Sequence, residues 1–178
     1  MRRLFAFSIT GSALLALATP SLGQQEAPTT PDCQAAATAL PPELAGWTAR
    51  TPIAAGTHSD KLGKATLTVG KAVDAALVHA PDVRYPLRPE QPGGSVSYGG
   101  IFAFKVSRAG TYRVALGSGA WVDIVKDGKA IESVAHGHGP DCSGIRKMVD
   151  FPLEPGNYVL EIAANGQSQL PLLVAHLP

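Results

Sequence analysis

The densest group of side chains able to do chemistry lies in the segment AHGHGPDCSGIRK, residues 135–147. One residue separates His136 from His138, so in an extended strand both imidazoles would lie on one face, as a shared metal ion requires. Asp141 adds a carboxylate, which completes a candidate iron or zinc site, or a zinc or copper store. The alternative is a glycine-rich crossover loop whose histidines are solvated or bonded to the loop. We expect no cofactor and keep iron or zinc as the alternative.

The N-terminal residues 1–23 have the pattern of a secretory signal peptide. Arg2 and Arg3 precede a mostly apolar run over residues 4–18, and small residues lead to a predicted cut after Gly23. The apolar run is shorter than the ~20 residues of a membrane-spanning helix. We therefore expect a periplasmic or secreted protein with no membrane span in its mature part.

The chain has two cysteines, Cys33 and Cys142. In an oxidising compartment an even number of cysteines predicts a disulfide. This bridge would close a loop of about 110 residues, and would stabilise the fold by ~4–5 kcal/mol in the chain-entropy account. A free Cys142 acting as a ligand or nucleophile is the competing hypothesis.

The charge balance indicates which partners are unsuitable. Of 15 basic residues, Arg2 and Arg3 leave with the signal peptide, so 13 remain against 14 acidic residues. A nearly neutral chain lacks the basic surface that nucleic acids require. We expect no nucleic-acid partner.

The mature chain has the alternating pattern of β-strands almost throughout. Phe102, Phe104 and Val106 would share one strand face, and the Asp127-Gly128 pair between alternating runs predicts a two-residue hairpin. The proline-rich residues 83–94 predict a sheet edge or long loop. Many short strands separated by turn residues predict an all-β protein, an antiparallel jelly-roll-like β-sandwich.

This sandwich is expected to be a single domain over residues 33–178, after a flexible leader at 24–32. Trp47, which follows a pair of prolines, is predicted to anchor the first strands. Two Gly-Thr/Asn-Tyr segments, at 110–112 and 156–158, lead into alternating runs. Each tyrosine is predicted to bury its ring while its hydroxyl reaches the backbone.

Residues 99–164, with the series FAFKVSRAGTYRVAL, VDIVKDGK and FPLEPGNYVLEI, resemble β-sandwich modules of the PA14 and carbohydrate-binding type. The resemblance implies a sandwich that binds sugar through its loops. PA14 modules that bind sugar through calcium use two adjacent aspartates after the first of these strands. Residues 117–121 here read GSGAW, which departs from that pattern because it contains no aspartate.

The mature chain is also similar to a group of small exported bacterial proteins that are sometimes labelled homogentisate dioxygenase. That label implies an iron enzyme that uses His136 and His138. A cupin dioxygenase would need a glutamate shortly after the pair, whereas residues 139–144 read GPDCSG. An iron dioxygenase of homogentisate type therefore remains the alternative function.

The function we expect is non-catalytic binding of a small molecule, a glycan or an envelope protein, and no catalytic residue is assigned. Trp121 and Tyr98 could stack on a sugar ring. Arg146 and Lys147 could bind a carboxylate or phosphate. These four side chains are the predicted ligand contacts.

Overall fold

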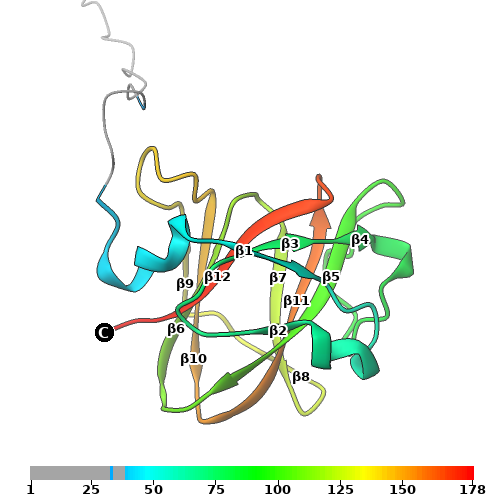
Figure 1. Cartoon of the computed structure of the whole chain (residues 1–178). Coiled ribbons are helices and arrows are strands. Elements are labelled where there is room, and N and C mark those ends of the chain that lie inside the picture. Colours follow the sequence, from blue (N-terminus) through cyan, green and yellow to red (C-terminus); the bar gives the residue numbers. More distant parts are fainter. Residues whose placement is uncertain (1–32, 34–38) are drawn as a thin grey trace, which may run out of the picture. The chain divides into compact units, whose positions relative to one another are not determined.

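The computed structural model describes Cys33 and residues 39–178 (Figure 1). The predicted signal peptide and leader lie outside the described residues. None of the helices in the described part is long and apolar enough to cross a membrane.

Two six-stranded sheets account for the architecture. Sheet A runs, in spatial order, through β1 (Thr51–Ala54), β3 (Val73–Ala76), β12 (Gln169–His176), β6 (Gly110–Leu116), β10 (Lys147–Leu153) and β9 (Ala135–Gly137). Sheet B runs through β2 (Thr66–Leu67), β5 (Tyr98–Val106), β11 (Gly156–Asn165), β7 (Trp121–Lys126) and β8 (Lys129–Ile131), and β4 (Val78–His79) pairs with β5. The prediction of an all-β sandwich is confirmed. Most neighbours are antiparallel, while β1 pairs with β3 and β2 with β5 in parallel.

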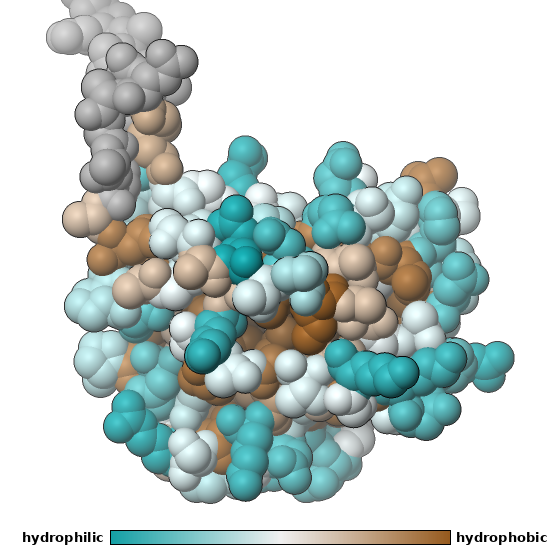
Figure 2. All heavy atoms as spheres, viewed as in Figure 1, coloured by the Kyte–Doolittle hydropathy of each residue, from teal (hydrophilic) through white to brown (hydrophobic). Residues whose placement is uncertain are grey.

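Alternate residues of the strands fill the space between the sheets. In β5 this inward set includes Phe102 and Phe104, and in β6 it includes Tyr112 and Val114, all at most 2% exposed. Figure 2 shows hydrophilic side chains surrounding a smaller central area of hydrophobic ones on one face of the molecule. The predicted period-two pattern is therefore the pattern of burial.

The Asp127-Gly128 pair forms the predicted hairpin between β7 and β8. Both residues have positive φ, 51° and 73°, and Lys126 pairs directly with Lys129. A two-residue turn of this kind matches the twist of the strands it joins. It sets the register in which β8 pairs with β7.

The two tyrosine segments form equivalent corners. The Tyr112 hydroxyl donates to the Arg108 carbonyl at 2.9 Å, and the Tyr158 hydroxyl donates to the Glu154 carbonyl at 2.7 Å. In each case the partner lies four residues earlier, before the strand begins. The buried rings thus fix the turns that lead into β6 and β11, as predicted.

Among the described residues, three short 3₁₀ helices lie outside the sheets: η1 (Pro42–Thr48), η2 (Ser59–Lys64) and η3 (Ala80–Asp82). Leu44 and Trp47 of η1 are buried against Leu173 and Ala175 of β12. These β12 residues alternate with the inward-facing set, so η1 covers the outer face of sheet A. Trp47 is the predicted anchor, although its main support is the last strand of the chain.

The proline-rich residues 83–94 form the predicted long loop. The loop packs on the outer face of sheet B, where the Tyr85 hydroxyl donates to the Ile162 carbonyl and the Leu87 amide donates to Glu161 Oε1, both at 2.9 Å. Glu161 alternates with the inward-facing Leu160 and Ile162 and is 0% exposed. The loop therefore buries an acidic side chain of β11.

Candidate functional site

The histidine segment divides into an edge strand and a loop. His136 lies in β9, opposite Val149 of β10. The strand ends at Gly137, and Nδ1 of His138 then lies 2.9 Å from the Arg146 carbonyl oxygen, to which it donates. Because β9 ends at Gly137, the strand alone does not place His138 on the face of His136, and a shared face stays a prediction. Only His136 lines a pocket.

The loop after the histidines is attached to the N-terminal part of the domain. Cys142 forms the predicted disulfide with Cys33, with the two Cα atoms 5.1 Å apart. The indole of Trp47 donates to the Ser143 carbonyl at 2.9 Å. Since the Cys142 sulfur is bonded to a second sulfur, it is not a thiolate ligand or nucleophile in this structure. The loop around Cys142 and Ser143 therefore has a structural role, since it ties β9 and β10 to the N-terminal part of the domain. It is called the strap below.

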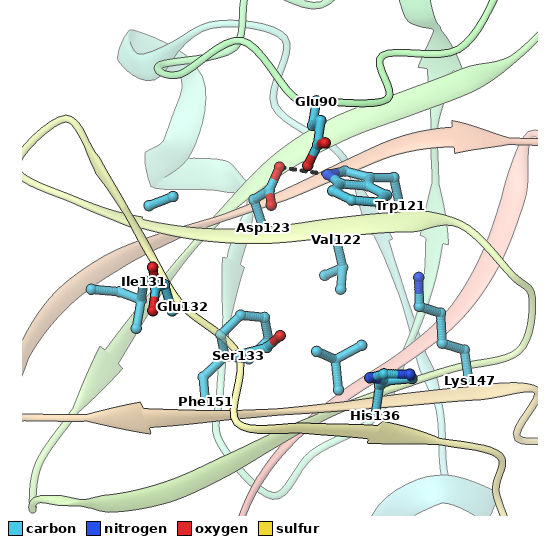
Figure 3. Close-up of a pocket in the computed structure, with 12 residues that line it drawn as sticks. Glu90, Trp121, Val122, Asp123, Ile131, Glu132, Ser133, His136, Lys147 and Phe151 are labelled. Carbon is cyan, nitrogen blue, oxygen red and sulfur yellow. Dashed lines mark hydrogen bonds between the residues drawn. The ribbon is translucent and has the colours of Figure 1, made fainter.

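Next to the strap lies a pocket of about 600 Å³ (Figure 3). It opens where sheet B faces the β9 edge of sheet A. Pairing between β8 and β7 ends at Ile131 and Ile124, so residues 121–123 of β7 pair with β11 alone. The early end of β8 leaves room at this edge for a ligand.

The pocket has an apolar part and a polar part. Val122, Val149 and Phe151 are at most 6% exposed, and with Ile131 they form the apolar part between the sheets. Figure 3 shows Trp121, Asp123 and Glu90 on the other side of β7. Charged and polar side chains of the remaining rim are Glu132, Ser133, His136 and Lys147.

Trp121 is held between two charged side chains. Its indole nitrogen donates to Asp123 Oδ2 at 2.7 Å, and Lys147 Nζ lies 5.7 Å from the ring centroid. Lys147 Nζ also donates to the Ala120 carbonyl at 2.8 Å. These contacts fix the ring in one orientation while it remains partly exposed, so it is a preorganised surface for stacking.

The same environment perturbs both charged groups. Burial raises the pKa of Asp123, and the neighbouring Glu90 carboxylate raises it further, against the hydrogen bond from Trp121. Burial lowers the pKa of Lys147, against the attraction of Asp123. The cost of burying each charge is therefore only partly offset by its neighbours. A ligand of opposite charge would gain binding energy by pairing with the Asp123 carboxylate or the Lys147 ammonium.

Of the four predicted ligand contacts, two line the pocket and two do not. Trp121 and Lys147 are pocket residues. Tyr98 instead stacks on His79, with ring centroids 4.8 Å apart, and the Arg146 side chain is exposed outside the pocket lining. Among the three candidate metal ligands, His136 lines the pocket, whereas His138 and Asp141 do not.

The sequence interpretation assigned none of the three pocket carboxylates, Glu90, Asp123 and Glu132, to a site. Asp123 lies two residues after Trp121, and this period-two spacing was a usable signal that both share a strand face. Glu90 comes from the long loop, and no local pattern connects it to β7. Loops reach a site through tertiary packing, which spacing along the chain does not encode.

Within Cys33 and residues 39–178, no group of three or more histidine, cysteine or acidic side chains is arranged to hold a metal ion. The iron or zinc prediction therefore gains no support from the described residues. The homogentisate dioxygenase alternative stays a prediction.

The fold and the pocket define the class of this protein as a two-sheet β-sandwich with a ligand-sized pocket at a sheet edge. No protein-family model matches this chain, and no curated protein matches it.

Proposed function

We propose that this protein is an exported, non-catalytic binding protein whose pocket takes a small glycan. The observation that carries the proposal is the fixed, partly exposed indole of Trp121, placed beside charged groups and an apolar surface. Sugars present hydroxyls at their edges and C–H groups on their faces. A rigid aromatic ring with nearby polar groups matches both features.

The size of the pocket supports a small ligand. A volume of about 600 Å³ lies within the range of roughly 300–1,000 Å³ that is usual for small-molecule sites. The indole N–H of Trp121 is already bonded to Asp123. The ring therefore offers its face to a ligand, and Asp123, Lys147 and His136 offer hydrogen bonds around it.

The Cys33–Cys142 disulfide is compatible with export, because such bridges persist in oxidising compartments. A periplasmic or secreted location is part of the proposal.

Binding of hexasaccharides to the purified mature protein tests this function. Saturation-transfer NMR with neutral, amino and acidic hexasaccharides would identify a ligand, and calorimetry would give its Kd. We expect Trp121→Ala to raise Kd at least about tenfold, as for a central aromatic contact. Trp121→Phe, which keeps an aromatic face, should retain most of the affinity.

The two histidines supply a matched control. His136→Ala removes a pocket residue, whereas His138→Ala changes a neighbouring exposed histidine outside the pocket. We expect only the first to weaken binding. If no hexasaccharide binds, or if the protein carries stoichiometric iron that is lost when both histidines are replaced, the glycan proposal is wrong.

A further inference from the structure

The pocket contains more acidic than basic side chains. Glu90, Asp123 and Glu132 line it together with Lys147 and His136. Both ion pairs found among the described residues lie elsewhere in the molecule. Within that part of the chain, none of the three pocket carboxylates forms an ion pair, and the cation that attracts Asp123 is Lys147.

Lys147 is already engaged by protein groups. Its Nζ donates to the Ala120 carbonyl and lies against the Trp121 ring. Asp123 accepts one hydrogen bond, from Trp121, through Oδ2. Its other oxygen, Oδ1, has no hydrogen-bond partner among the described residues. The pocket is consequently better supplied with acceptors than with donors.

A buried carboxyl lies next to this acidic group. Glu161 is paired across the strands with Asp123, so both side chains lie on the outer face of sheet B. Glu161 is 0% exposed, and its Oε2 atom has no hydrogen-bond partner within the part of the chain that the structure describes. Glu161 thus adds a second carboxyl group beside Asp123, and a cation bound there would favour the ionised forms of both.

On these grounds, and resting on the proposed function, we propose that the natural ligand is an amino sugar whose protonated amine pairs with Asp123 and Glu90 while its ring stacks on Trp121. A neutral sugar would leave the carboxylates unpaired. An acidic sugar would be repelled by them. The raised pKa of Asp123 agrees with this arrangement, because a bound ammonium would favour the ionised carboxylate.

Three hexasaccharides with the same β-1,4-linked pyranose backbone test the proposal. Those of glucosamine, N-acetylglucosamine and glucose differ at one carbon, which carries an ammonium, an acetamide or a hydroxyl group. At about pH 6, below the ordinary pKa of an amine, we expect the glucosamine hexamer to bind at least about tenfold tighter than the other two. Added salt should reduce the difference.

Two variants identify the group responsible. Asp123→Asn should reduce the preference for the amine severalfold, and Trp121→Ala should weaken binding of whichever hexamers the wild type binds. Asp82→Asn, at an exposed acid outside the pocket, is the matched control and should change nothing. Circular dichroism checks that each variant is folded.

The outcomes separate this inference from the proposed function. Equal binding of the three hexamers, or tighter binding of an acidic hexamer, overturns the amine proposal and leaves glycan binding intact. If spermidine, an amine without a sugar ring, binds and no hexasaccharide does, both the proposed glycan binding and the amino-sugar inference are overturned. A preference for the amine that survives Asp123→Asn unchanged also overturns the proposed contact.

Discussion

Replacing Glu161 with glutamine should remove a pH-dependent loss of stability. Burial raises the pKa of Glu161 from 4.5 to about 7, and the Asp123 carboxylate adds to this against the hydrogen bond from the Leu87 amide. Between these values the folded protein holds a proton that the unfolded chain has released. Folding stability is therefore greatest at the acidic end of this window and decreases as the pH rises through it.

The magnitude follows from the width of the window. At about 1.4 kcal/mol per pH unit, the rise from 4.5 to about 7 corresponds to a loss of about 3 kcal/mol, complete above pH 7. Glutamine cannot ionise, and like the protonated acid it keeps an acceptor for the Leu87 amide. The variant should therefore gain about 3 kcal/mol relative to the wild type between pH 4.5 and pH 8.

Urea unfolding at several pH values, followed by tryptophan fluorescence, measures this difference. Comparing the two proteins at each pH cancels the titration of every other group that the substitution leaves unaffected. Glu154→Gln, at an exposed position just before β11, is the matched control and should follow the wild type. If the difference in free energy of unfolding between Glu161→Gln and the wild type stays constant across the whole pH range, the reasoning is refuted.

Three further predictions concern the frame. Replacing Cys33 and Cys142 with serine should lower the free energy of unfolding by ~4–5 kcal/mol, because the bridge spans 109 residues. An unchanged urea midpoint would show that the disulfide does not stabilise the fold. Gly128→Ala places a side chain at φ 73° and should cost ~1–2 kcal/mol by the same measurement, whereas no cost would exclude the hairpin geometry. Tyr112→Phe and Tyr158→Phe should each lower the free energy of unfolding by ~1 kcal/mol. The loss should be larger for Tyr158, because its hydroxyl both donates and accepts a hydrogen bond. Variants as stable as the wild type would mean that these hydroxyl contacts do not stabilise the fold.

Features that depend on neighbouring residues could be predicted from the sequence. Alternation identified the buried faces of β5 and β6, and the Asp127-Gly128 pair located a hairpin whose two central residues need positive φ. The disulfide followed from an even number of cysteines together with predicted export. Each of these features is determined either by a few neighbouring residues or by the composition of the whole chain.

Features that depend on distant packing could not. Glu161 was indistinguishable from any polar residue on an outward strand face, because the loop that covers it begins nearly eighty residues earlier. The spacing of His136 and His138 suggested one shared face, yet β9 ends between them. Where an edge strand stops is set by its partner strand and by the strap, and alternation alone carries no information about it.

The order of sheet A has a consequence for biosynthesis. Its β12 strand lies between β3 and β6, although it is made after both of them and after every other described strand. Until residues 169–176 emerge, the two flanking strands cannot be joined and the sandwich lacks the middle of one wall. The chain must therefore remain open until β12 has been made, and a polypeptide that lacks residues 169–176 would be unable to close its sandwich.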